Sequence, residues 1–271
     1  MSSAAIGLTA GAGPVLRLRR STAHLRALVR RGLLQIKADP NSLFDVVLAP
    51  VIYTVLFVYV FGGAISSSRA EYVQYVMPGL MAMVAINVAM TAGVGVNSDF
   101  STGMMDRFRT LPISRFSVLA AQVLVEAGRM AVTMAVLLGM GFALGLRVPG
   151  GALGLAGAAG LTMLFGMALL WVSVLLGLTL NSPQAVQGIG MVAVLPLQFG
   201  SSIFAPTGTM PGWLRAFTDV NPLSNLADAC RALVNGEGAV AAPALTTVAW
   251  AAGIALVVAP LAAVRFGRGD R

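Results

Sequence analysis

The sequence predicts an all-α membrane protein with six transmembrane helices. Of its 271 residues, 57% are hydrophobic and only 10% are charged, and the mean hydropathy is +0.84. Soluble domains are about 45–50% apolar and about 25% charged. A bilayer excludes charge at a cost of roughly 2.5–3.5 kcal/mol per charged residue at the centre of a helix. A chain with so little charge therefore belongs to the membrane class.

Six segments reach the length of about 20 predominantly apolar residues that a transmembrane helix needs. They lie at about 43–62, 76–96, 121–146, 153–180, 186–204 and 244–264. The stretches between them are short and no internal repeat is visible, so residues 1–271 are expected to form a single transmembrane domain. The net charge of +8 is interpreted as a topology signal and not as a nucleic-acid site, because most of the chain is uncharged.

The basic residues predict which side of the membrane each loop occupies. With a cytoplasmic N-terminus, the cytoplasmic side receives Arg17, Arg19, Arg20, Arg26, Arg30, Arg31, Lys37, Arg107, Arg109, Arg115, Arg265, Arg268 and Arg271. The external side then receives only Arg69, Arg147, Arg215 and Arg231. Both termini are therefore expected in the cytoplasm.

Ahead of the first span, the segment 20–38 is expected to be a basic amphipathic elbow helix. Its apolar residues recur at helical spacing and form one stripe: Leu25, Leu28, Val29, Gly32, Leu33 and Ile36. A helix of this kind lies in the membrane surface. An anchor for anionic lipid and an additional contact with a cytosolic partner both agree with the pattern.

A short charged helix is expected at 101–111, after the second span. One face carries Met104, Met105, Phe108 and Leu111, and the remainder carries Asp106, Arg107 and Arg109. Pro112 ends the helix, because proline lacks a backbone donor and clashes with the preceding turn. Methionine adapts to irregular grooves, and arginine with aromatic residues is typical of interfaces. The helix is interpreted as a docking element, and a loop whose arginines only enforce topology is the alternative.

The third expected span contains Glu126 and Arg129, three residues apart on a helix. Ionisable residues inside a membrane are functional-site candidates by default. Counting back from the external end of the span places both residues near the cytoplasmic interface. Asp45 lies in a similar position, near the cytoplasmic end of the first span. A structural ion pair is therefore favoured over a role in substrate binding or gating.

The external segment 205–240 contains two helical signals that are too short to cross the membrane. In the second, Asn221 is the expected N-cap, Pro222 the first helical position and Gly236 part of the C-terminal stop. Asp228 and Arg231 are three residues apart and can pair. Short helices of this kind are interpreted as re-entrant, which requires that they pack against protein or line a cavity.

The order of these parts resembles the permease subunits of type-2 ABC exporters, in particular the daunorubicin-resistance-like branch of actinobacteria. The resemblance covers nearly the whole chain. Its best marks are DRFRTLPISR (106–115), similar to the family's coupling segment, and NPLSNLADACRALVNG (221–236), similar to its signature before the final span.

This resemblance implies an export permease in the bacterial cell membrane that dimerises, with itself or with a related permease, and binds two cytosolic ATPase subunits. It implies that helix 101–111 couples the ATPase to the spans, and it assigns the external gate to the signature residues Asn221, Pro222, Leu223, Asp228, Arg231 and Gly236. ATP and Mg²⁺ would be bound by the ATPase, with no cofactor or metal on this chain. In agreement, the sequence has no GxxxxGK[ST] phosphate loop, and its single lysine, Lys37, follows LLQI.

A substrate route is expected along the dimer seam, on the methionine-rich faces of the second and fifth spans. Its candidate residues are Met77, Met81, Met83, Asn87, Met90, Met191, Gln198 and Phe199. Adaptable side chains with sparse polar groups suit varied apolar cargo. Plain helix packing explains the same residues equally well.

The favoured function is export of a hydrophobic or amphipathic compound, such as a drug or secondary metabolite, as in antibiotic efflux. Export of lipid or lipid-linked polysaccharide is the alternative. A membrane-embedded enzyme is disfavoured, because one histidine and scattered acids provide no cluster for metal or acid–base chemistry. A proton-driven transporter would need a buried carboxylate relay, for which only Glu126 is available.

Overall fold

The computed structural model describes residues 44–66, 68–101 and 115–268, and these residues form helices and no strands. The expected elbow helix at 20–38 lies outside the described residues. So does the expected coupling helix at 101–111, except for Ser101 at the end of α5. The structure therefore says nothing about the six docking residues from Met104 to Arg109 or about Leu111.

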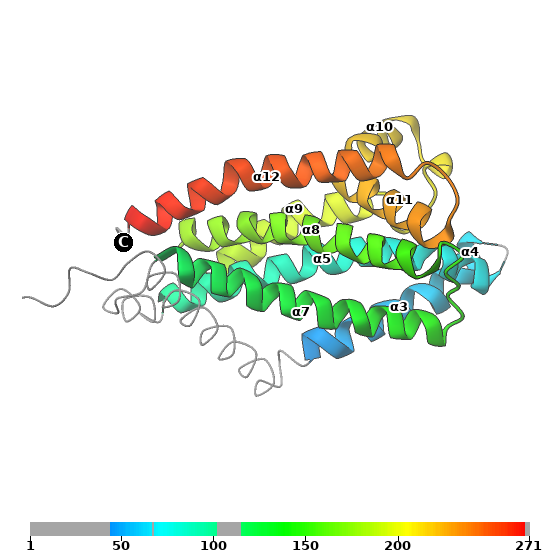
Figure 1. Ribbon diagram of the computed structural model, residues 1–271, viewed down its shortest axis with the longest axis horizontal. Coiled ribbons are helices and arrows are strands. Elements are labelled where there is room, and N and C mark those ends of the chain that lie inside the picture. The colour runs from blue at the N-terminus through cyan, green and yellow to red at the C-terminus, as the bar shows by residue number, and fades with distance from the viewer. Residues whose placement is uncertain (1–43, 67, 102–114, 269–271) are drawn as a thin grey trace, which may run out of the picture.

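The described chain forms long helices that run side by side (Figure 1). The first span is broken into η1 (Phe44–Leu48), α3 (Ala49–Leu56), η2 (Phe57–Phe61) and α4 (Gly62–Ile65), with π-helical η1 and η2 on either side of α3. The remaining elements are α5 (Arg69–Ser101), α7 (Arg115–Ala143), α8 (Gly151–Thr179), α9 (Pro183–Phe199), η3 (Thr207–Thr209), α10 (Gly212–Val220), α11 (Pro222–Asn235) and α12 (Ala241–Arg268).

Five helical segments within the described residues are long and apolar enough to cross a membrane: Phe44–Phe61, Arg69–Asp99, Gln122–Ala143, Gly151–Thr179 and Ala241–Phe266. The expected fifth span, 186–204, corresponds to α9, which has 17 residues. At 1.5 Å per residue α9 is about 26 Å long, slightly shorter than a bilayer core of about 30 Å. It ends at Phe199 because Gly200 turns the chain. The count of six spans therefore stays a prediction.

Helix α5 is at the centre of the bundle and α12 is at its edge. In the most apolar stretch of each helix, 72% is buried in α5 and 17% in α12. Glycines bring α5 and α8 together: a Cβ on Gly93 would lie 2.6 Å from the Ser173 carbonyl oxygen. Asn97 then donates from Nδ2 to the carbonyls of Gly177 at 2.8 Å and Leu180 at 2.6 Å. Such small-residue contacts are typical of helix pairs in membranes.

The two short helices α10 and α11 lie at one end of the bundle, opposite the C-terminal end of α12 (Figure 1). The caps expected for α11 are confirmed. Asn221 Oδ1 accepts from the backbone N–H of Leu223 at 2.9 Å, Pro222 opens the helix, and Gly236 closes it with a φ of +68°. Helix α11 packs against α5, α8 and α12, and its Leu223, Leu226, Ala227, Cys230 and Val234 are buried.

Candidate functional site

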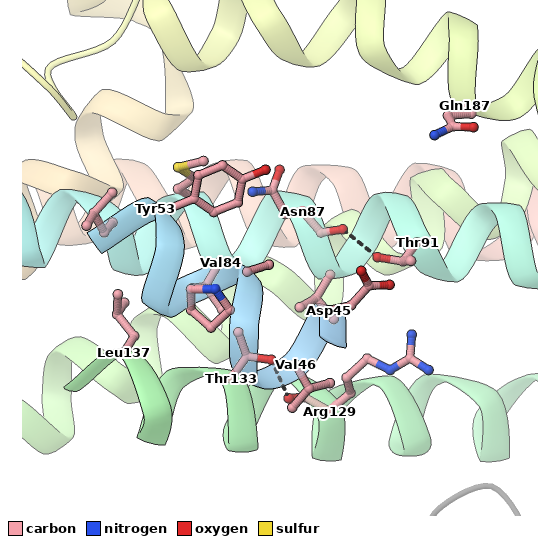
Figure 2. Close-up of a pocket in the computed structure, with 15 residues that line it drawn as sticks. Asp45, Val46, Tyr53, Val84, Asn87, Thr91, Arg129, Thr133, Leu137 and Gln187 are labelled. Carbon is pink, nitrogen blue, oxygen red and sulfur yellow. Dashed lines mark hydrogen bonds between the residues drawn. The ribbon is translucent and has the colours of Figure 1, made fainter. Parts of the chain in front are cut away.

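A cavity lies between the first span and helices α5, α7 and α9 (Figure 2). It has two adjoining parts of about 280 Å³ and 450 Å³. Both parts are lined by Tyr53, Met83, Asn87, Thr91 and Gln187. Since a drug-sized ligand occupies a pocket of roughly 300–1,000 Å³, the combined space is large enough for one.

The walls of the cavity are mainly apolar, and two of their hydroxyl groups already donate hydrogen bonds to the protein backbone. Thr91 donates to the carbonyl of Asn87 at 2.8 Å, and Thr133 donates to the carbonyl of Arg129 at 3.0 Å. The side chains that remain to meet a ligand's polar groups include the amide of Gln187 and the hydroxyl of Tyr53. An apolar wall with a few polar groups is typical of small-molecule sites.

One end of the cavity is charged. Figure 2 shows Asp45 and Arg129 at the same end, with Tyr53 and Leu137 at the other. The expected pair forms: Arg129 Nε lies 3.6 Å from Oε2 of Glu126, which is only 4% exposed. Asp45, Glu126 and Arg129 carry formal charges of −1, −1 and +1, so this end has one negative charge in excess.

Six of the eight residues expected on the substrate route line the larger part of the cavity: Met83, Asn87, Met90, Met191, Gln198 and Phe199. The other two, Met77 and Met81, are fully buried in the core. A Cβ on Gly141 would lie 2.7 Å from Met77 Cε, so Met77 fills the contact between α5 and α7. For Met77 and Met81, helix packing is the better explanation.

Several lining residues were not expected from the sequence. Tyr53 and Phe57 come from the first span, Thr91 from α5 and Gln187 from α9. Tyr53 and Gln187 are polar residues within otherwise apolar helices. This feature of the sequence could have marked them as candidates for the cavity wall. The sequence places Asp45 and Arg129 near the same membrane interface, but it carries no signal that these residues of different spans line one cavity.

A second polar cluster lies at the α11 end of the bundle, around Arg231. Its Nη1 is 2.5 Å from Asp228 Oδ1, which confirms the expected pair. The guanidinium also lies over the ring of Tyr75, 3.9 Å from its centroid. The side chain of Arg231 is only 12% exposed, so the charge is held inside the protein and not on its outer surface.

Comparison with known proteins decides the family. A model of the ABC-2 type transporter family matches residues 23–234. The chain belongs to this family. It is 36% identical to a daunorubicin resistance ABC transporter permease of Streptomyces coeruleorubidus over 256 residues, which cover 94% of this chain and 89% of that protein.

Two mycobacterial proteins are also similar to this ABC permease. A protein of Mycobacterium tuberculosis described as a probable doxorubicin resistance ABC transporter permease is 26% identical, over 86% of this chain and 84% of its own. A second doxorubicin resistance ABC transporter permease of that organism is 24% identical, over 68% and 67%. The expected family is thus confirmed: the chain is a multi-pass membrane permease subunit of an ABC transporter, a family whose members pair with ATPase subunits.

Proposed function

We propose that this permease exports a hydrophobic or amphipathic compound, with the cavity between the first span, α5, α7 and α9 as part of its route. The observation that carries the proposal is the cavity itself, which combines adaptable methionines with a few polar groups. The similarity to drug-resistance permeases supports a drug or secondary metabolite as cargo.

The exposed surface of α9 supports a dimer of two permeases. Val192 is 76% exposed and Phe199 is 60% exposed, and the polar Gln184 and Gln187 are also exposed. Both glutamines lie in the first two turns of α9, at one end of the helix, and the exposed apolar residues continue the same surface toward its other end. A second permease copy on this face would cover the glutamines and enclose the cavity.

The energy source is proposed to be two separate cytosolic ATPase subunits, which would bind ATP and Mg²⁺. The sequence lacks a phosphate loop, so its own backbone offers no cradle for the phosphates. Helix 101–111 is the proposed docking element, and both termini would lie in the cytoplasm with the ATPases. In this arrangement the chain performs transport and leaves hydrolysis to its partner.

The proposal is tested by reconstituting the chain with its ATPase in lipid vesicles and following a fluorescent amphiphile such as Nile red. Transport is expected with ATP and the complete complex. It should be lost when the ATPase is omitted or when its catalytic carboxylate is replaced. Transport by the chain alone, without ATP, would contradict the proposal, and ATP-driven movement of labelled lipid without Nile red would favour the lipid alternative.

A further inference from the structure

All five N–H groups of the Arg231 guanidinium have acceptors. Nε donates to the carbonyl of Tyr75 at 3.0 Å, and Nη1 donates to Asp228 Oδ1 and, at 3.3 Å, to Ser202 Oγ. Nη2 donates to the carbonyls of Ser202 and, at 3.2 Å, Ile203. Arginine has five donors in a planar fork, so each donor of this largely buried cation has a partner.

These acceptors come from three parts of the fold. Tyr75 belongs to α5, Asp228 to α11, and Ser202 and Ile203 to the turn 200–204 that follows α9. Two tyrosines of α5 strengthen the same junction. Tyr75 Oη donates to the Ser202 carbonyl at 2.8 Å, and Tyr72 Oη donates to the Phe204 carbonyl at 3.2 Å. The turn is therefore bonded to α5 directly and through Arg231.

Helix α5 is shaped to receive this turn. A Cβ on Gly79 would lie 2.6 Å from the Ile203 carbonyl oxygen and 3.2 Å from Arg231 Nη2. Only a residue without a side chain allows such a close approach. The preceding Pro78 has no N–H and interrupts the backbone hydrogen bonding of the helix at this point. Together Pro78 and Gly79 provide a notch for the turn.

The turn sets the position of one wall of the cavity. Gln198 and Phe199, which line the cavity, immediately precede it in the chain. Gln198 Nε2 donates to Asn87 Oδ1 on α5 at 3.0 Å. Moving Ser202 and Ile203 away from Arg231 would therefore also move the end of α9 and the cavity side chain of Gln198.

We propose that Arg231 is a positioning residue for transport, which ties α5, the turn 200–204 and α11 into one unit that stays closed during the cycle, in contrast to the gate role that the family resemblance implies for Asp228 and Arg231. This inference rests on the proposed function. Breaking the cluster would leave a largely buried cation with fewer acceptors, which is unfavourable. The exit for cargo would then open beside the exposed face of α9 and not between α9 and α11.

The test compares Arg231→Lys with Arg215→Lys in the reconstituted permease–ATPase complex. Lysine keeps the charge but has three donors on one nitrogen, so it cannot reach all three elements at once. Arg215 is exposed on α10 and donates from Nε to the Thr207 carbonyl at 3.2 Å, which makes it a matched control. Arg231→Lys should lower ATP-driven Nile red export about tenfold, and Arg215→Lys should leave it unchanged.

A cross-link distinguishes positioning from mere stability. Ser202 Oγ and Asp228 Oδ1 are 2.8 Å apart, so cysteines at both positions can be joined by a short thiol cross-linker, in a Cys230→Ser background. The two cysteines remove the Ser202 hydroxyl and the Asp228 carboxylate that accept from Arg231, so the reference is the same double variant before cross-linking. The cross-link should raise the export of this variant, and it should also raise export when Arg231→Gln is added. Reversible loss of export on cross-linking would overturn the proposal, because the junction would then have to open.

Two other results would also overturn it. Equal export by Arg231→Lys and the wild type would show that the cluster does not position the cavity. Recovery of the melting temperature of Arg231→Gln by the cross-link, without recovery of export, would show a different role for Arg231. Failure of the wild-type complex to export at all is a separate outcome, which contradicts the proposed function.

Discussion

The side-chain amide of Gln198 in α9 donates a hydrogen bond of 3.0 Å to Asn87 Oδ1 in α5, across 111 residues of sequence. Gln198 is buried, and both residues line the cavity. Helix α9 has few neighbours apart from α5. This bond therefore contributes to holding the cavity wall in place.

Removing this bond should destabilise the contact between α9 and α5. Gln198→Ala is expected to cost about 1–3 kcal/mol, because Asn87 Oδ1 loses its partner at this partly buried contact. Adding Asn87→Ala to Gln198→Ala should cost less stability than Asn87→Ala costs in the wild type, since the two residues share one hydrogen bond. Thermal unfolding of the detergent-solubilised complex measures both, with Gln184→Ala on the exposed part of α9 as the control. If the stability losses of the two single variants add up to that of the double variant, the two residues do not act as a pair.

Asp45 should favour positively charged cargo. Its carboxylate is the one acidic group among the described residues that line the cavity, and the nearby Arg129 is paired with Glu126. Asp45→Asn is expected to raise the half-saturating concentration of tetraphenylphosphonium in ATPase stimulation by about tenfold, or about 1.4 kcal/mol. The anion tetraphenylborate, of the same shape, should not be weakened.

Asp219→Asn is the matched control for Asp45→Asn, because Asp219 is an exposed acid on α10, outside the cavity lining. Asp45→Glu should keep most of the preference for the cation. Identical responses of the cation and the anion to Asp45→Asn would show that this carboxylate does not select cargo.

Gly154 should be irreplaceable at the contact between α8 and α11. A Cβ at this position would lie 2.1 Å from the Leu233 carbonyl oxygen, which belongs to rigid backbone. Gly154→Ala is expected to destabilise the protein by about 1–3 kcal/mol. Gly160→Ala on the same helix has open space around it and should be neutral or stabilising by up to about 1 kcal/mol. Equal melting temperatures for both variants would contradict this packing.

Phe108 should contribute more to ATPase binding than the arginines beside it. This prediction comes from the sequence pattern of helix 101–111. A buried aromatic anchor typically costs about 2 kcal/mol or more when it is truncated, which is roughly thirtyfold in affinity. Arg107→Ala should have a smaller effect. Measured ATPase binding that is normal in Phe108→Ala would exclude the docking role, and disturbed membrane insertion after neutralising Arg107, Arg109 and Arg115 would support the topology alternative.

Local features of the fold could be predicted from the sequence, and contacts between distant segments could not. The caps of α11 depend on Asn221, Pro222 and Gly236 themselves, so their types and spacing were sufficient. The pair of Asp228 and Arg231 was predictable for the same reason.

The partners of Arg231 in α5 and in the turn 200–204 are 156 and 29 residues away in the chain and carried no local signal. The pathway residues on α5 illustrate a second limit. Helix α5 is apolar on all sides because it lies at the centre of the bundle, so its periodicity does not distinguish the cavity face from the core face. The sequence pattern therefore does not separate Met77 and Met81 from Met83 and Met90, and only the latter two line the cavity.

The export rate of a permease with a blocked cavity tests the central claim most directly. Met191→Trp places a large ring at the cavity wall, whereas Val257→Trp adds the same ring to the exposed surface of α12, outside the cavity lining. Both are measured as ATP-driven Nile red export by the reconstituted complex, together with basal ATPase activity. Met191→Trp should lower export at least tenfold while basal ATPase activity and the Val257→Trp control stay near wild type. Unchanged export by Met191→Trp would contradict the account, because cargo would then pass elsewhere.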